Sequence, residues 1–232
     1  MTAIAGNVLM NASMMCADPM HLGHEVDALV GAGIDMFHCD VMDGVFVPNI
    51  TLGLYQIEAL SKLSTVPIEV HLMVSKPEDY VETLADYGVA IITVHAESTR
   101  HLSRLLHSIK KRGIRVGLSL NPATPVTSVK DVMHLVDLLQ IMTVDPGFAG
   151  QAFLTRSNER VAEARTMLEE LGLHDVTIQV DGSINTTTIP DVVASGAKSL
   201  VLGSSSLFGV GTDHYEERII ELRKVAGLHG TN

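Results

Sequence analysis

Short runs of strand-forming apolar residues alternate along this chain with longer segments in which apolar residues recur at helical spacing. Such runs predict buried strands, and the segments between them predict helices that cover the strands. The eight predicted strands are Val8–Met14, Met36–Val41, Ile68–Met73, Ile91–His95, Arg115–Leu120, Leu138–Val144, Thr177–Asp181 and Ser199–Leu202. Eight strand–helix units in 232 residues predict an α/β fold, a TIM (β/α)8 barrel that takes up residues 1–232 as a single domain.

Turn-forming residues mark the ends of the predicted helices. Three segments combine a capping side chain with a proline, and we expect each to begin a helix: Asp18-Pro19, Ser75-Lys76-Pro77 and Thr124-Pro125. Five glycines follow helical segments and precede strands, as C-terminal caps do: Gly33, Gly88, Gly113, Gly172 and Gly196. Their agreement with the eightfold alternation supports the barrel.

Composition narrows the class of protein. Aromatic residues make up only 4% of the chain and tryptophan is absent, so the core must be aliphatic. The net charge of -11 argues against a nucleic-acid partner, although backbone N–H groups could still bind a small phosphate. No apolar run reaches the length of a membrane span, and no signal peptide is recognisable. With only Cys16 and Cys39 and no disulfide framework, we expect a reduced, cytoplasmic protein.

Two histidines and two aspartates lie at or near the ends of predicted strands. His38 and Asp40 share one face of the second strand, because side chains alternate along a strand. If that face points into the barrel, both meet His71 of the third strand and Asp181 of the seventh near the carboxyl-terminal rim, where active sites of this fold lie. Two imidazoles and two carboxylates suit one divalent metal ion such as zinc, iron, manganese or cobalt. Two carboxylates can also move a proton from one face of a carbon to the other.

A purely structural interpretation would make the histidines core residues with satisfied hydrogen bonds and the aspartates helix caps. This interpretation is reasonable for any one of the four positions. For all four together it is disfavoured, because inward carboxylates on a barrel are costly unless a cation or a proton offsets their charge.

Glycine-rich segments follow the last three predicted strands: Asp145–Gln151, Gly182-Ser183 and Gly203–Ser205. Barrels often bind phosphate with the loops after their late strands, where glycine lets a ligand approach the backbone closely. Three such loops favour a phosphate site over plain turns. Met42, Met73 and Met142 lie near strand ends on the presumed inner face, either as adaptable core filler or as a polarizable lining of the site.

Several of these segments resemble the signature motifs of the ribulose-phosphate 3-epimerase family. The resemblance extends from about Ser13 to Phe208 and rests on the segments His38–Asn49, Val70–Val74, Met142–Gln151, Val180–Gly182 and Leu202–Ser204. It implies a metal-dependent isomerase that inverts C3 of a ketose phosphate through a cis-enediolate. It also implies a sugar-phosphate substrate and a homo-oligomer, although no segment identifies an interface.

The resemblance implies a role for each matching position. His38, Asp40, His71 and Asp181 correspond to the metal ligands of the family. Asp40 and Asp181 also correspond to its catalytic acid/base pair. The positions that correspond to substrate contacts are Ser13, Met42, His71, Met73, Met142, Gly147, Phe148, Ala149, Gly150, Gly182, Ser183, Gly203 and Ser204.

Three loop positions bear on the substrate. The D-ribulose 5-phosphate branch of the family usually has asparagine before the Pro-Gly-Phe sequence, glycine after it, and two successive glycines after the seventh strand. This chain has Asp145, Ala149 and Ser183 there, which resembles the D-allulose-6-phosphate 3-epimerase branch. We therefore expect D-allulose 6-phosphate, converted to D-fructose 6-phosphate, as the preferred substrate. D-ribulose 5-phosphate, converted to D-xylulose 5-phosphate, is the alternative.

Two other functions fit less well. A decarboxylase or aldol-type synthase of the orotidine-monophosphate type would carry an Asp-x-Lys-x-x-Asp motif, whereas the segment Asp40–Asp43 contains no lysine. A non-catalytic sugar-phosphate-binding barrel would have lost its acid/base pair, yet Asp40 and Asp181 are both present.

Overall fold

The computed structural model describes residues 8–227, and within them the eight predicted strands form a closed parallel barrel in chain order. β1 pairs with both β2 and β8, which closes the ring. The strands are β1 (Leu9–Ser13), β2 (Met36–Met42), β3 (Ile68–Met73), β4 (Ile91–His95), β5 (Arg115–Leu120), β6 (Leu138–Met142), β7 (Thr177–Asp181) and β8 (Ser199–Leu202). The predicted TIM barrel is confirmed, with strand ends shifted by at most two residues.

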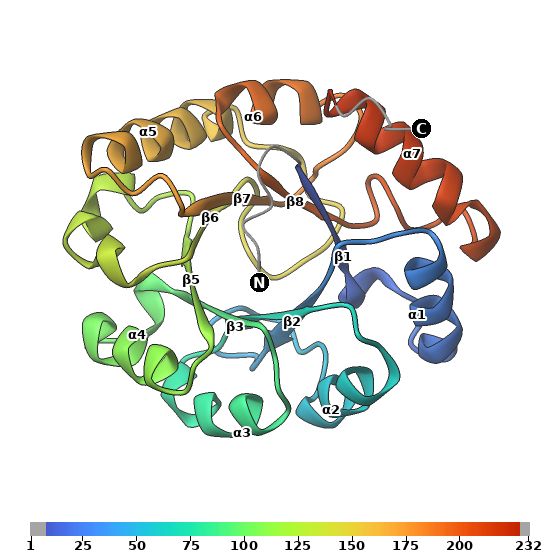
Figure 1. Cartoon of the computed structure of the whole chain (residues 1–232), viewed down its shortest axis with the longest axis horizontal. Coiled ribbons are helices and arrows are strands. Elements are labelled where there is room, and N and C mark those ends of the chain that lie inside the picture. The colour runs from blue at the N-terminus through green and yellow to red at the C-terminus, as the bar shows by residue number, and fades with distance from the viewer. Residues whose placement is uncertain (1–7, 228–232) are drawn as a thin grey trace.

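Helices surround this ring of strands (Figure 1). The α-helices are α1 (Leu22–Gly31), α2 (Leu54–Leu63), α3 (Val81–Asp86), α4 (Leu102–Lys111), α5 (Ser157–Glu170), α6 (Ile189–Ser195) and α7 (Tyr215–Val225). Between β5 and β6 the chain forms a long 3-10 helix, η4 (Val126–Leu135), where the alternation predicted an α-helix. Shorter 3-10 turns are η1 (Met14–Cys16), η2 (Pro77–Asp79), η3 (Ala96–Ser98) and η5 (Thr212–His214). No helix in residues 8–227 combines the length and hydropathy that crossing a membrane requires.

The two kinds of helix signal had different outcomes. The five predicted C-terminal glycines all have positive φ, between 68° and 125°, which confirms their role at helix ends. Of the three predicted helix starts, Pro77 begins η2 and Pro125 directly precedes η4, but none of the three segments provides a side-chain cap. Asp18 accepts a hydrogen bond from the Met20 N–H within a turn, and α1 begins only at Leu22. Short polar side chains stabilise such turns as readily as helix ends, so the signal does not separate them.

Alternation along the strands divides their side chains between two environments. On β2, Phe37, Cys39 and Val41 face outward and join the large apolar core beneath the helices. The barrel interior is apolar at its amino-terminal end, where Met36, Ile91 and Leu138 pack together, and Met42 and Met73 pack with Val47 at the other end. Further along the strands the interior is polar yet fully buried, with Asn11, His38, Glu69, His71, Thr93, His95, Ser119, Gln140 and Gln179.

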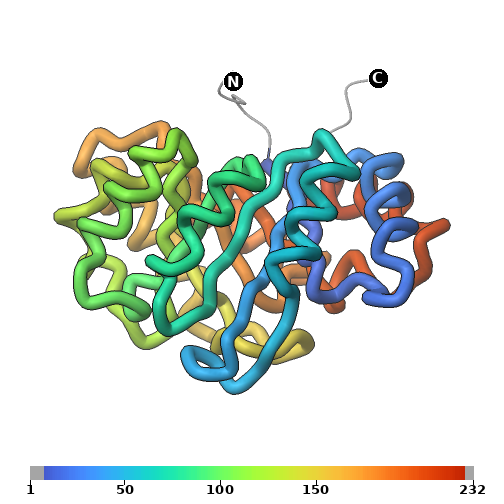
Figure 2. Tube along the Cα trace, turned by 90° about the horizontal axis from the view of Figure 1, so that it is seen from below, coloured from blue at the N-terminus to red at the C-terminus, as the bar shows by residue number. Residues whose placement is uncertain are grey.

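The loops after β2 and β6 project together on one side of the barrel (Figure 2). Asn49 in the first loop donates a hydrogen bond of 2.7 Å from its side chain to the Gly147 carbonyl in the second. Asp43 holds the first loop by accepting hydrogen bonds from the backbone N–H groups of Val45, Phe46 and Ser75. Two loops about 100 residues apart in sequence therefore meet over the carboxyl-terminal end of the barrel.

The polar interior depends on a glycine in β5. A Cβ atom on Gly117 would lie 2.0 Å from the Thr93 hydroxyl oxygen and 2.9 Å from the Thr93 Cα. We predict that Gly117→Ala lowers the free energy of unfolding by about 1–3 kcal/mol, as overpacking does. Urea-induced unfolding followed by circular dichroism would measure the change.

Gly23→Ala is the matched control, because the added Cβ has no heavy atom within 4 Å and lies in α1. This variant should be as stable as the wild type or slightly more stable, since alanine favours helix over glycine. Equal stability of Gly117→Ala and the wild type would contradict the packing argument.

Candidate active site

The four predicted metal ligands meet inside the barrel near its carboxyl-terminal end. His38 and Asp40 come from β2, His71 from β3 and Asp181 from the end of β7. One ligand atom from each lies within 4.8 Å of the others. Asp40 Oδ1 is 3.2 Å from His38 Nε2 and 3.0 Å from His71 Nδ1, while Asp181 Oδ2 lies 3.6 and 3.5 Å from the same two nitrogens. The geometry thus points both rings and both carboxylates at one centre.

Attraction between the imidazoles and the carboxylates of this cluster outweighs the effect of burial on their pKa values. Burial alone would raise the pKa of Asp40, but the charge and hydrogen bonds of His38 and His71 outweigh it and hold that pKa well below its ordinary value. The pKa of Asp181 is lowered against burial by the same two imidazoles. Burial lowers the pKa of His38, but Asp40 and Glu69 raise it overall, and hydrogen bonds to the two aspartates raise that of His71. These opposite shifts favour ionised carboxylates and protonated imidazoles in the metal-free protein, so that the charges of the cluster offset one another.

A divalent cation fits this donor set. Carboxylate oxygens and imidazole nitrogens converge without an arginine or lysine among them, and buried carboxylates need a positive partner. Mixed nitrogen and oxygen ligands suit zinc, iron, manganese or cobalt. His38, Asp40, His71 and Asp181 are the residues that would hold the ion.

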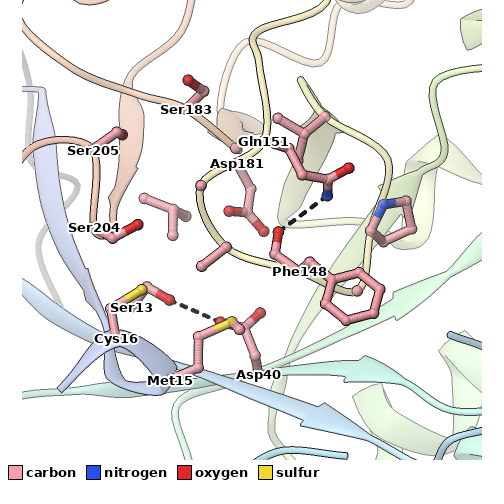
Figure 3. A pocket seen from close by; sticks show the side chains of 18 of the residues that line it. Ser13, Met15, Cys16, Asp40, Phe148, Gln151, Asp181, Ser183, Ser204 and Ser205 are labelled. Atoms are coloured by element: carbon pink, nitrogen blue, oxygen red, sulfur yellow. Dashed lines mark hydrogen bonds between the residues drawn. The ribbon is translucent and has the colours of Figure 1, made fainter. Parts of the chain in front are cut away.

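A pocket opens above the cluster, and Asp40 and Asp181 face each other across its floor (Figure 3). Ser13 at the end of β1 donates a hydrogen bond of 2.9 Å to Asp40 Oδ2. The three predicted methionines, Met42, Met73 and Met142, all line the pocket. They give it an apolar wall directly above the charged cluster.

The late glycine-rich loops also line the pocket. The predicted residues from these loops that line it are Gly147, Phe148, Ala149, Gly150, Gly182, Ser183, Gly203 and Ser204. Gly182 has a φ of 118°, and a Cβ there would meet Val144 at 2.4 Å, so only glycine fits. Ser183 has a φ of 55° and is the one non-glycine residue with positive φ among residues 8–227. Such backbone strain is common at binding sites.

Two positions lie outside the wall of the pocket. The His71 side chain is fully buried and does not line the pocket, so its expected contact with substrate stays a prediction. The Asp145 side chain is exposed and does not line the pocket either, although this position was expected to border the phosphate end. Side-chain direction decides both placements, and the sequence leaves it open in loops and at the ends of strands.

Sequence reasoning also missed polar residues that support the cluster. Glu69 accepts a hydrogen bond from His38 at 3.0 Å, and His95 lies 2.8 Å from His71 between their Nε2 atoms. Burial lowers the pKa of His95 to about 4, so this ring is neutral. Alternation on β3 could have found Glu69, because it shares the inward face of His71 two residues later. Met15 and Cys16 also line the pocket and carried no signal, whereas Gln151 and Ser205, which line it too, lie within the predicted glycine-rich segments.

Comparisons with known proteins agree with this site. The model of the Ribulose-phosphate 3 epimerase family matches residues 9–208. The chain is 42% identical to the ribulose-phosphate 3-epimerase of Bacillus subtilis, over 83% of this chain and 89% of that protein. It is 39% identical to the chloroplastic ribulose-5-phosphate-3-epimerase of Arabidopsis thaliana, over 92% and 75% of the two chains.

Among solved structures, a mutant tryptophan synthase α-subunit from Pyrococcus furiosus is similar in fold alone. Its TM-score is 0.69 at 11% identity, covering 94% of this chain and 97% of that one. The family match, by contrast, spans the four clustered ligands and every glycine-rich loop of the pocket. The chain therefore belongs to the ribulose-phosphate 3-epimerase family, and it is an enzyme of the isomerase class.

Proposed function

We propose that this chain is a ketose-phosphate 3-epimerase in which Asp40 and Asp181 exchange a proton with opposite faces of C3. The observation that carries the proposal is the convergence of these two carboxylates, from β2 and β7, on the floor of one pocket. Two proton-transfer groups on opposite sides of a carbon can invert it, whereas one group returns the proton to the side it came from.

Different residues of the chain would carry out different parts of the reaction. A divalent cation bound by the four-residue cluster would supply a Lewis acid that polarises the substrate carbonyl. Asp40 is ionised and oriented by Ser13, so it can accept the C3 proton. Asp181 must first take up a proton from solvent, which the negative charge developing on the cis-enediolate favours. It then donates that proton to the other face of C3, which leaves Asp40 protonated and Asp181 ionised, the state that starts the reverse reaction.

The loops would bind the rest of the substrate. Gly147, Gly182 and Gly203 line the pocket, and the backbone N–H groups of such glycine-rich loops suit a phosphate group. Binding this remote group would hold C3 between the two aspartates. Met42 and Met73 would exclude water from the reactive intermediate.

Two observations bear on the identity of the substrate, and they favour different sugar phosphates. Ala149 and Ser183 line the pocket and resemble the D-allulose 6-phosphate branch, so we propose the hexulose phosphate as the preferred substrate. D-ribulose 5-phosphate is the second candidate, because the similar curated proteins carry that activity in their names. The cytoplasmic location, the homo-oligomeric state and the extent of the domain over residues 1–232 stay predictions.

Replacing either carboxylate should separate proton removal from inversion. We predict that Asp40→Asn and Asp181→Asn each lower kcat by about 10²- to 10⁴-fold, the usual worth of a positioned acid or base. In D₂O, Asp181→Asn should still exchange the C3 proton of the epimer that Asp40 deprotonates, without inverting C3. Nuclear magnetic resonance of the sugar phosphate would follow both processes.

Asp18→Asn is the matched control, since Asp18 lies in the exposed loop after β1 and outside the pocket. It should retain kcat within about twofold, as surface substitutions do. Inversion at near wild-type rate by either variant, with its metal content intact, would exclude the two-carboxylate mechanism.

Metal binding should compete with protons. The pKa of His38 is raised well above its usual value in the metal-free protein, so a cation must displace a proton to bind. We predict that Co²⁺ affinity rises as pH rises from 6 to 8, by about tenfold per pH unit for each proton displaced. Calorimetry in buffers of different ionisation enthalpy would count those protons. His101→Gln, at an exposed site, is the control, and pH-independent affinity would contradict the prediction.

Parallel kinetics on the two sugar phosphates would decide the substrate. We predict a kcat/KM at least about tenfold higher for D-allulose 6-phosphate than for D-ribulose 5-phosphate, or about 1.4 kcal/mol in transition-state binding. Ser183→Gly should shift the ratio toward the pentulose, because Ser183 lines the pocket. Asp145→Asn should leave the ratio unchanged, because Asp145 does not line it. A wild-type preference for the pentulose would show that the loop residues do not select the hexulose.

A further inference from the structure

Glu69 is a fully buried carboxylate that the proposed reaction does not use. It lies on β3 inside the barrel, in register with His38 of β2, and its exposed fraction is 0%. The Thr93 hydroxyl donates a hydrogen bond of 2.6 Å to its Oε1, and the Gln179 amide donates one of 2.7 Å to its Oε2. His38 Nδ1 lies 3.0 Å from the same Oε2. The Thr93 hydroxyl and the Gln179 amide are donors, and the same carboxylate oxygen that accepts from Gln179 makes His38 Nδ1 a third donor.

The contact with Glu69 determines which nitrogen of His38 carries the proton. With Nδ1 donating to Glu69, neutral His38 has its lone pair on Nε2. That nitrogen is the one 3.2 Å from Asp40 and 3.6 Å from Asp181, so the lone pair points at the centre of the cluster. The opposite tautomer would aim an N–H bond at the same point and could not ligate a cation there.

His71 requires the opposite tautomer, because its Nδ1 faces the cluster. Nδ1 lies 3.0 Å from Asp40, and Nε2 lies 2.8 Å from His95 Nε2. A free lone pair on Nδ1 places the proton on Nε2, which then donates to His95. The Gln140 amide nitrogen also lies 3.1 Å from His71 Nε2, and its oxygen has no partner. Turning that amide by 180° would make its oxygen a second acceptor for the same proton.

If His95 Nε2 accepts the proton of His71, the neutral His95 ring must carry its own proton on Nδ1. His95 Nδ1 is buried and has no hydrogen-bond partner, but it lies 3.4 Å from Glu97 Oε2. Glu97 is held in place by the backbone N–H of Asn121, at 2.9 Å, and by the Thr124 hydroxyl. A small movement of this carboxylate would complete a chain from Glu97 through His95 to His71.

We propose that Glu69, acting directly, and Glu97, acting through His95, are positioning residues that hold His38 and His71 in the tautomers competent to bind the catalytic cation. The proposal rests on the metal site of the proposed function and adds the groups that orient it. Outer carboxylates of this kind raise the basicity of a ligating imidazole and fix its ring. Each imidazole of the site thus has its own outer carboxylate: His38 contacts Glu69 directly, and His71 is linked to Glu97 through His95.

Metal affinity and imidazole protons would test the proposal. We expect Glu69→Gln to weaken Co²⁺ binding by about 10- to 100-fold in calorimetry, the range for lost outer partners. Glu97→Gln should weaken it less, because its contact is indirect and its side chain is partly exposed. Nitrogen-15 spectra of the zinc-loaded wild type should show His38 protonated at Nδ1 and His71 at Nε2. In Glu69→Gln the His38 signal should shift or disappear.

Thr93→Val is the matched control, because it removes another hydrogen bond to Glu69 and leaves the His38 contact in place. It should bind Co²⁺ within about threefold of wild type, even if its thermal stability falls. A loss of Co²⁺ affinity as large as that of Glu69→Gln would indicate that the hydrogen bonds around Glu69 only stabilise the fold. Because Glu97→Gln alters a partly exposed loop, it tests the proposal even if Glu69→Gln fails to fold. Wild-type affinity in both glutamine variants, or His38 protonated at Nε2, would overturn this inference alone. No Co²⁺ binding by the wild type would overturn the metal site as well.

Discussion

His38 contacts all three carboxylates that the barrel encloses, and the rest of the site depends on these contacts. Its Nδ1 lies 3.0 Å from Glu69, and its Nε2 lies 3.2 Å from Asp40 and 3.6 Å from Asp181. Three carboxylates this close together in a nearly dry interior would repel one another strongly. A positive group between them is therefore a condition for folding around this site. In the metal-free protein the protonated imidazole can be that group, and a bound cation can take over the role.

The scaffold supplies the space that this arrangement needs. The absence of a side chain at Gly117 lets Thr93 occupy the interior, and the Thr93 hydroxyl in turn donates to Glu69. An apolar layer of Met36, Ile91 and Leu138 closes the barrel beneath these polar layers. The large aliphatic core lies outside the strands, against the helices, where most of the apolar surface is buried. The stability of the fold and the polarity of the site thus come from opposite faces of the same strands.

Chemistry and recognition occupy different parts of the pocket. The charged groups lie on strands, whose hydrogen-bonded frame holds them rigidly, while the glycine-rich walls lie in loops after β6, β7 and β8. The bond from Asn49 to Gly147 joins one of these walls to the loop after β2. Substrate preference can therefore change through loop residues such as Ala149 and Ser183 while the carboxylates stay in place.

The sequence alone determined the strand order, the inward faces of the strands and the four clustered ligands. Period-two alternation is a local property, and a closed parallel barrel brings the carboxyl ends of all strands to one rim. Glu69 was open to the same argument and was overlooked, although it precedes His71 by two residues. Only the tertiary structure decided that the segment between β5 and β6 is the 3-10 helix η4, that the Asp145 side chain does not line the pocket and that the His71 side chain is fully buried. It also decided which nitrogen of each imidazole faces the centre. These features depend on side-chain rotation and on contacts between distant segments, such as His71 with His95, and a linear pattern of residue types contains neither.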